Sequence, residues 1–232
     1  MELSKRLKAV AGLVTEGASV ADIGTDHGYV PIWLVQSGRA SKVIAMDVNE
    51  GPLERARGHI RSKRLEGVIF TRRSDGLQAL RAGEADTMIA AGMGGGLVIR
   101  ILEDSPEIVA DMKEFILQPQ SEIHKVRKYL NSHGFCSVEE RMVEEDGKYY
   151  PMMKLVHGEE EPYTEEELYY GRILLRKKDP VLYQLLQKEH TLKKTIADRL
   201  ADQSGEGAES RRRELGEELA RIERAIASYE NR

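Results

Sequence analysis

The feature that most constrains this chain is the stretch 20–31, which reads VADIGTDHGYVP. Apolar residues up to Ile23 predict a buried strand, and Gly24 and Gly28 then enclose a tight turn. A second apolar run begins at Val30 and predicts a helix. A strand, a glycine turn and a helix in succession bring a nucleotide-like ligand against bare backbone at the edge of a parallel sheet. We therefore expect an α/β fold with a ligand site at this turn.

Strand and helix patterns alternate along the first part of the chain. Apolar runs predict strands at 19–23, 42–46, 67–72, 86–91 and 114–117, and helices are expected at 3–14, 31–35, 52–64, 97–102 and 122–132. Such alternation is typical of a parallel sheet with helices on both faces. Two further strands, 135–143 and 148–157, flank the dipeptide Asp146-Gly147, which favours a hairpin turn. We expect a Rossmann-like α/β fold with a seven-stranded, mostly parallel sheet closed by an antiparallel hairpin.

The last part of the chain has a different pattern, because apolar residues recur with heptad-like spacing. They are Leu182, Leu185, Leu186, Leu192, Ile196 and Leu200, and, after a polar break at 203–208, Leu215, Leu219, Ile222, Ile226 and Tyr229. Two striped helices with a short break between them predict an antiparallel coiled coil. A preceding helix is expected at 168–178, ended by Pro180. We expect two domains: a Rossmann-like domain, 1–158, and a helical coiled-coil domain, 159–232.

Composition limits the class of protein. The chain has 232 residues, a formal net charge of −4 and one cysteine, Cys136, so it has no internal disulfide framework and fits a reducing compartment. No apolar stretch approaches the roughly 18 residues of a membrane span, and the first residues lack the apolar run of a signal peptide. We expect a cytoplasmic monomer. The six histidines show no metal-ligand spacing, so we expect no metal site.

Acidic residues follow three successive predicted strands. Asp22, Asp47 and Asp75 stand at the carboxyl ends of these strands, where open parallel sheets bind their ligands. A carboxylate after the second strand suits the two hydroxyls of a ribose, and Asp75 with the amide of Gly76 suits the exocyclic amine and a ring nitrogen of adenine. The turn lacks the Gly-x-Gly-x-x-Gly spacing of a dinucleotide site, which argues against an oxidoreductase.

The pattern acid-x-Gly-x-x-x-Gly that begins at Asp22 resembles the first motif of class I S-adenosylmethionine-dependent methyltransferases. Five segments together resemble the bacterial tRNA adenine-22 N1-methyltransferases: DIGTDHGY at 22–29, DVN at 47–49, SDG at 74–76, AGMGG at 91–95 and QP at 118–119. The resemblance covers nearly the whole chain. It implies methyl transfer from S-adenosyl-L-methionine to N1 of an adenine in the D-loop region of tRNA, and a coiled coil that engages the tRNA.

The resemblance also assigns expected roles to individual residues. Those expected to bind the cofactor are Asp22, Gly24, Gly28, Asp47, Val48, Asp75, Gly76 and Gly92. Asp26 is the candidate catalytic carboxylate, because methyl transfer to N1 leaves a cationic ring that a nearby carboxylate would stabilise. His27 would act as an orienting donor or as a proton acceptor. Asp26 could equally bind the ammonium group of the cofactor. Those expected to contact tRNA are Tyr29, Met93, Gly94, Gln118, Pro119, Arg211 and Arg212.

Several alternatives stay open. The stretch 90–96 lacks the Asn/Asp-Pro-Pro-aromatic turn of enzymes that methylate the exocyclic amine of adenine. N1 lies on the pairing edge, so the base must be unpaired or flipped, and Tyr29 could stack on it or belong to the core. The basic clusters at 55–64, 72–73 and 211–213 fit either phosphate contacts or solvated helix faces. The alternative functions are methylation of another RNA, a protein or a small molecule, or non-catalytic RNA binding.

Overall fold

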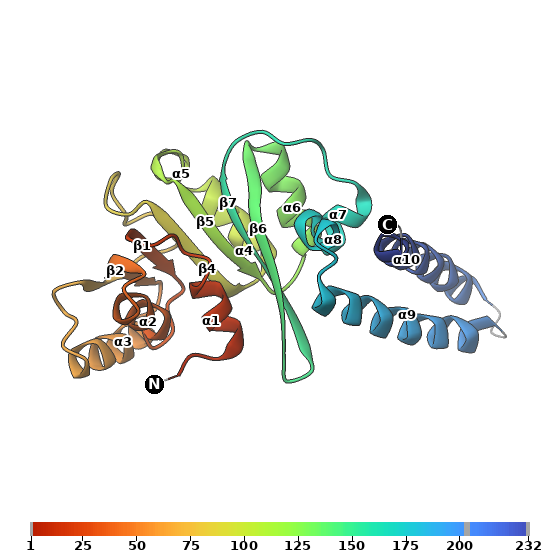
Figure 1. The fold of residues 1–232 in the computed structure, drawn as a ribbon, viewed down its shortest axis with the longest axis horizontal. Coiled ribbons are helices and arrows are strands. Elements are labelled where there is room, and N and C mark those ends of the chain that lie inside the picture. The colour runs from red at the N-terminus through yellow and green to blue at the C-terminus, as the bar shows by residue number, and fades with distance from the viewer. Residues whose placement is uncertain (1, 202–204, 231–232) are drawn as a thin grey trace. The chain divides into compact units, whose positions relative to one another are not determined.

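The computed structural model of the chain describes residues 2–201 and 205–230. The chain divides into two compact units, residues 1–161 and residues 162–232, which are described separately (Figure 1). The boundary that the sequence predicts between the two domains, after residue 158, stays a prediction.

The first unit is an α/β fold. Its strands are β1 (Ala18–Ile23), β2 (Ala40–Asp47), β3 (Ile69–Arg73), β4 (Thr87–Met93), β5 (Glu114–Pro119), β6 (Phe135–Glu145) and β7 (Lys148–His157). Its helices are α1 (Lys5–Ala11), α2 (Tyr29–Gln36), α3 (Glu50–Ser62), α4 (Gly95–Glu103), α5 (Pro106–Asp111) and α6 (Ile123–Ser132). All the strands that the sequence predicts are present, whereas α5 was not expected from the sequence.

The seven strands form one sheet in the order β3-β2-β1-β4-β5-β7-β6. Strands β1 to β5 pair in parallel, and β7 runs antiparallel to both β5 and β6. This confirms the predicted Rossmann-like, mostly parallel sheet. The strand order reverses between β1 and β4, and ligands of open parallel sheets bind at such a reversal, beyond the carboxyl ends of the strands.

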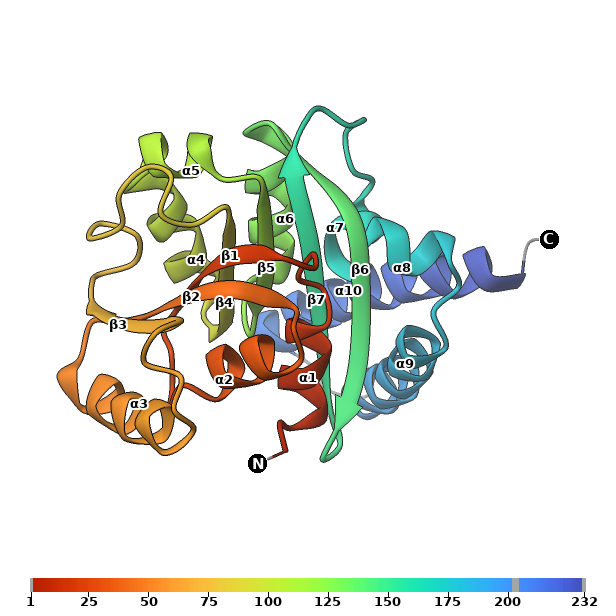
Figure 2. The same ribbon diagram turned by 60° about the vertical axis from the view of Figure 1, so that its left-hand side comes forward.

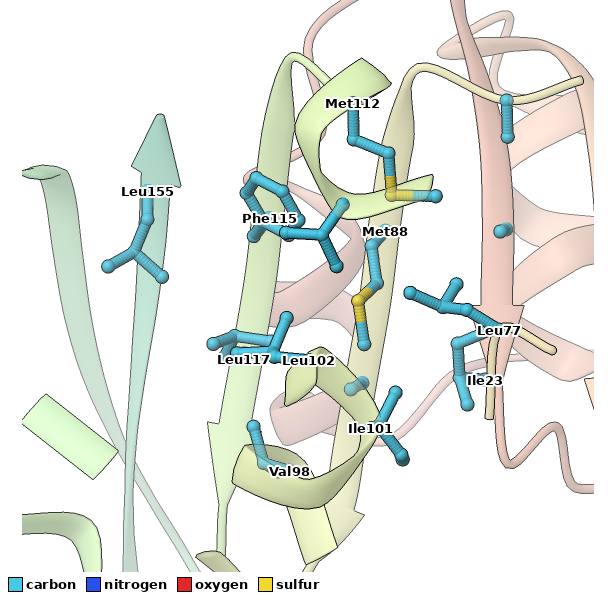
Figure 3. Packing of buried hydrophobic residues seen from close by; sticks show 14 of the residues in the cluster. Ile23, Leu77, Met88, Val98, Ile101, Leu102, Met112, Phe115, Leu117 and Leu155 are labelled. Atoms are coloured by element: carbon cyan, nitrogen blue, oxygen red, sulfur yellow. The ribbon is translucent and has the colours of Figure 1, made fainter. Parts of the chain in front are cut away.

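Helices cover both faces of the central strands of the sheet. Successive side chains of a strand point to opposite faces, so Met88 of β4 belongs to one apolar cluster and Ile89 to the other. Figure 3 shows part of the first cluster, to which Met88 of β4, Phe115 of β5 and Ile101 of α4 all belong. The second cluster joins the sheet to α1, α2 and α3. Since neither face is open, the strand ends are where polar functional side chains are positioned.

The β6–β7 hairpin extends beyond the end of the neighbouring strand β5. Its turn residues, Asp146 and Gly147, have φ of 53° and 75°, as a two-residue type I′ turn requires. Strand β7 pairs with β5 only up to Leu117, opposite Met153, and the rest of the hairpin continues past that point (Figure 2). Because β7 is antiparallel to β5, this overhanging part lies at the carboxyl ends of the parallel strands.

The second unit is helical. It contains α7 (Glu165–Tyr170), α8 (Arg172–Arg176), α9 (Pro180–Ala201) and α10 (Glu206–Glu230). The single helix expected at 168–178 is therefore wrong in detail: Gly171, with φ of 95°, separates two short helices. Pro180 occupies the first position of α9, where its missing N–H costs no helical hydrogen bond.

Helices α9 and α10 form an antiparallel pair. His190 Nε2 lies 3.2 Å from Glu223 Oε1, and Lys193 Nζ lies 2.5 Å from Glu218 Oε2. Buried apolar side chains of the two helices are Leu182, Leu186, Leu215, Ile222 and Ala225. The predicted helical hairpin is confirmed, and its supercoiling stays a prediction. Neither these long helices nor any other helix within residues 2–201 and 205–230 has the length and apolar character to cross a lipid bilayer.

Candidate active site

The glycine turn after β1 is fixed by the strand beside it. The N–H groups of Gly24 and Thr25 both donate to the carbonyl oxygen of Met46, at 2.8 and 2.9 Å. Gly24 and Gly28 have φ of 73° and 70°, a region that glycine enters without strain. A Cβ on Gly28 would lie 3.1 Å from the Cβ of Ala56, so this glycine lets the start of α2 approach α3 closely.

Asp22 is a buried carboxyl at the end of β1. Burial raises its pKa from 3.8 to about 6, and the charge of Asp47 adds to the increase. The nearby Thr25 hydroxyl partly offsets this increase in the pKa of Asp22. Thr25 Oγ1 is itself buried and has no hydrogen-bond partner of ordinary geometry among the described residues. A buried acid beside an unpartnered hydroxyl suits a ligand that carries hydrogen-bond donors and positive charge.

Asp47 ends β2. Its Oδ1 accepts a hydrogen bond from the N–H of Asn49 at 2.7 Å, which orients the carboxylate. The backbone carbonyl of Asp47 accepts from the N–H of Ser74 at 2.9 Å, so the loops after β2 and β3 are held together. The next side chain, Val48, is 49% exposed. An exposed valine next to an oriented carboxylate suits contact with a sugar and a flat base.

Val48 and Asp75 line the same open hollow, of about 460 Å³. The other residues lining it are Arg73, Ser74, Gln78 and Ala79. Asp75 Oδ1 accepts a hydrogen bond from Arg100 Nη2 at 2.9 Å. Gly76 has φ of 56°, and a Cβ there would lie 2.9 Å from Ile101 Cγ1, so only glycine fits. Gln78 had no role in the sequence interpretation, since nothing in its pattern distinguishes it from a solvated glutamine.

Asp26 lies at the exposed side of the glycine turn. Its side chain is 73% exposed, and its Oδ1 lies 3.3 Å from His27 Nε2 and 3.5 Å from Arg55 Nη2. Arg55 comes from α3. The sequence alone fits two roles for Arg55, a solvated surface residue and a phosphate contact. The structure places it beside the candidate catalytic acid.

Three rings gather at the same turn. The ring centroids of His27, Tyr29 and His59 lie 5.1 to 5.7 Å from one another, with interplanar angles of 16° to 25°. Tyr29 is thus half-buried among imidazoles. His59 had no expected role, but its position four residues after Arg55 puts both side chains on the face of α3 that meets the turn.

The end of β4 approaches both the glycine turn and β5. Gly92, with φ of 83°, interrupts the regular pairing with β5, and Gly94 precedes α4. A Cβ on Gly24 would lie 3.1 Å from Met93 Cε, so Met93 lies against the first turn. Gln118 is fully buried, and its Oε1 accepts from Arg6 Nη1 at 2.8 Å. Pro119, the last residue of β5, is also buried.

The two predicted tRNA-contacting arginines belong to the second unit. Arg211 Nη1 lies 2.8 Å from Glu214 Oε2 and 3.5 Å from Glu218 Oε1. Arg212 Nη1 donates to the carbonyl of Leu200 at 2.9 Å. Both guanidinium groups therefore have partners within the helical hairpin, and their contact with tRNA stays a prediction.

Known proteins resemble this chain in sequence and in fold. Residues 3–153 match the family described as "Methyltransferase domain". The tRNA (adenine(22)-N(1))-methyltransferase of Bacillus subtilis strain 168 is 36% identical over 159 residues, which cover 68% of this chain and 67% of that protein. A Streptococcus pneumoniae protein, solved in complex with S-adenosyl-L-methionine, superposes with a TM-score of 0.86 at 31% identity over 97% of this chain and 100% of that one. The B. subtilis M1A22 tRNA methyltransferase TrmK gives a TM-score of 0.85 at 29% identity, covering 97% of this chain and 99% of its own.

The fold and these relatives together identify the chain as an S-adenosyl-L-methionine-dependent methyltransferase. Within that class, the chain belongs to the family of bacterial tRNA (adenine-22 N1)-methyltransferases.

Proposed function

We propose that this enzyme transfers the methyl group of S-adenosyl-L-methionine to N1 of an adenine in the D-loop region of tRNA. The observation that carries the proposal is the alignment of Asp22, Asp47 and Asp75 along one edge of the sheet beside the glycine turn. The name of the B. subtilis relative supplies the acceptor, adenine 22 of tRNA.

The residues at the sheet edge fit the cofactor from end to end. Asp47 takes the ribose hydroxyls, while Val48, Asp75 and the amide of Gly76 take the adenine ring. Asp22 and the unpartnered Thr25 hydroxyl face the amino-acid end. The remaining glycines of the site, Gly24, Gly28 and Gly92, bring backbone close to the ligand. Bound S-adenosyl-L-methionine supplies an electrophilic methyl group on a positively charged sulfur.

Catalysis on N1 depends mostly on positioning. N1 of adenine has an in-plane lone pair, so an oriented and unpaired base attacks the methyl group without prior deprotonation. Asp26 stabilises the ring that becomes cationic, and His27 orients Asp26 through the 3.3 Å contact. Because Asp26 is 73% exposed, its charge is fully effective only when bound tRNA excludes water from it.

The large substrate is contacted at several places in this proposal. The acceptor base lies nearest Met93 and Gly94, above the buried Gln118 and Pro119 of β5, and Tyr29 lies beside the glycine turn. Arg211 and Arg212 of the helical hairpin contact phosphates of the tRNA. The enzyme acts as a cytoplasmic monomer.

Nucleoside analysis tests this function. Purified enzyme is incubated with S-adenosyl-L-methionine and unmodified tRNA, and the RNA is digested and analysed by mass spectrometry. The expected product is 1-methyladenosine. Binding of the cofactor without any methylated nucleoside would contradict the proposal and direct attention to a protein or small-molecule acceptor.

A further inference from the structure

A second hollow lies at the carboxyl edge of the sheet, apart from the one that Val48 and Asp75 line. Its volume is about 370 Å³, within the range of about 300 to 1,000 Å³ typical of small-ligand pockets. Tyr149, Tyr150, Lys148, Gln120 and Ile123 contribute to its lining, together with the end of β5. This hollow combines aromatic rings, an amide and a cation.

Its position follows from the topology of the sheet. Strand β7 begins beyond the point where β5 ends (Figure 2), and its first residues line the hollow together with the segment that follows Pro119. Gln120 belongs to that segment, and its N–H donates to the carbonyl of Met93 at 2.9 Å. The hollow is therefore joined directly to the end of β4, where the acceptor is expected.

Helix α1 fixes the overhanging hairpin. The backbone N–H of Lys5 donates to Glu145 Oε1 at 2.5 Å, and Lys5 Nζ donates to the carbonyl of Glu144 at 2.9 Å. The Arg6 guanidinium carbon lies 5.5 Å from the centroid of the Tyr150 ring, within cation–π range. These contacts, between residues about 140 positions apart in sequence, hold the tip of the hairpin against α1.

Arg6 also reaches the ends of β4 and β5. Its Nη1 donates to Gln118 Oε1 at 2.8 Å, and a Cβ on Gly92 would lie 3.4 Å from the same nitrogen. A Cβ on Gly92 would also lie 3.7 Å from Gln120 Nε2. One guanidinium thus connects the Tyr150 ring, the buried amide at the end of β5 and the glycine turn at the end of β4.

We propose that this hairpin hollow receives the flipped acceptor base, with Tyr150 as the stacking surface and Arg6 as the residue that positions it. The inference rests on the proposed function and adds the subsite for the base. Unpaired RNA bases are recognised by stacking on aromatic side chains, and a neighbouring lysine suits the flanking phosphate. The ring of Tyr29 already packs with two imidazoles, so Tyr150 is the better candidate for this role.

Kinetics of purified variants on unmodified tRNA test the inference. Tyr150→Leu is expected to lower kcat/KM for tRNA by about 5- to 150-fold, the range that base–aromatic stacking spans. Tyr150→Phe, which keeps the ring, is expected to stay within about twofold of the wild type. Affinity for S-adenosyl-L-methionine, measured by calorimetry, should be unchanged in both variants and also reports that they are folded.

A double-mutant cycle tests the positioning role of Arg6. If Arg6 acts through Tyr150, the effects of Arg6→Ala and Tyr150→Leu on kcat/KM are not additive, whereas independent structural roles would add. Phe70→Leu is the matched control, because Phe70 is a 43% exposed aromatic of β3, at the opposite edge of the sheet.

The outcomes separate the two proposals. A wild-type enzyme that forms 1-methyladenosine together with a Tyr150→Leu variant of unchanged kcat/KM would overturn the base subsite and leave the proposed function intact. A wild-type enzyme that binds the cofactor but methylates only a protein or a small molecule would overturn both.

Discussion

His59 Nδ1 lies 2.8 Å from the backbone carbonyl oxygen of His27. His27 is a non-glycine residue with φ of 59°, a conformation that costs free energy unless the surroundings hold it. Helix α3 therefore fixes the backbone of the turn that carries Asp26. The contact joins the glycine turn after β1 to a residue 32 positions later, on a helix that also supplies Arg55.

Replacing His59 should disturb this turn. We expect His59→Ala to lower the free energy of unfolding by about 1 kcal/mol, the usual value of one hydrogen bond. We also expect a lower kcat per folded molecule, because the turn that carries Asp26 is then less firmly held. Chemical denaturation and single-turnover kinetics measure the two effects. A variant with wild-type kcat would show that His59 is not needed to hold the turn.

Asp26→Asn separates the two roles that the sequence leaves open. If Asp26 stabilises the cationic product ring, the variant binds S-adenosyl-L-methionine normally and its kcat falls by roughly 10²-fold. If the carboxylate instead holds the ammonium group of the cofactor, calorimetry will show weaker cofactor binding. Glu66→Gln, an exposed acid in the loop after α3, is the control.

The raised pKa of Asp22 predicts a pH-dependent cofactor affinity. Burial raises this pKa to about 6, so the carboxyl is ionised at pH 7 and becomes neutral as the pH falls through about 6. Because only the ionised form attracts an ammonium group, the affinity for S-adenosyl-L-methionine should fall below that pH. Calorimetry between about pH 5 and 8 measures it. Asp22→Asn should bind weakly with no such step, and a step in that variant would assign the titration to another group.

The same pKa shift predicts the sign of a stability change. A carboxyl whose pKa is higher in the folded than in the unfolded state binds more protons when folded, so ionising it lowers the stability. Between about pH 4 and 6, the free energy of unfolding of the wild type should therefore decrease relative to that of Asp22→Asn as the pH rises. Parallel pH profiles of the two proteins would contradict this assignment.

Two glycines with positive φ allow a matched comparison. Gly76 and Gly83 have φ of 56° and 76°, but a Cβ on Gly76 would lie 2.9 Å from Ile101 Cγ1, whereas one on Gly83 meets nothing within 4 Å. Gly83→Ala should therefore cost only the backbone strain, about 1 kcal/mol. Gly76→Ala should cost about 1 to 3 kcal/mol more and weaken cofactor binding. Thermal unfolding of both variants measures the difference, and equal losses would refute the packing argument.

The parts of the fold that follow from local pattern could be predicted. Apolar runs that end in acids predicted β1 and β2, and Asp146-Gly147 predicted the hairpin. Strand burial and turn geometry depend on residues that are neighbours in the sequence. The break at Gly171 was missed, since one glycine within a helical pattern does not by itself show a φ of 95°.

The parts of the site that depend on tertiary contacts could not be predicted. Arg6 meets Gln118 across 112 positions, and His59 meets His27 only because α3 packs beside the turn. No local periodicity encodes such pairs. The acids were predictable because the carboxyl ends of parallel strands share one edge, whereas Arg100, which binds Asp75, comes from α4.

The most direct test of the account compares two tRNA substrates that differ at one base. The enzyme is given radiolabelled S-adenosyl-L-methionine and either an unmodified tRNA transcript or the same transcript with adenine 22 replaced by guanine. We predict methyl incorporation into the first RNA, as 1-methyladenosine, and none above background into the second. Equal incorporation into both transcripts, or into neither, would contradict the assignment of adenine 22 as the acceptor.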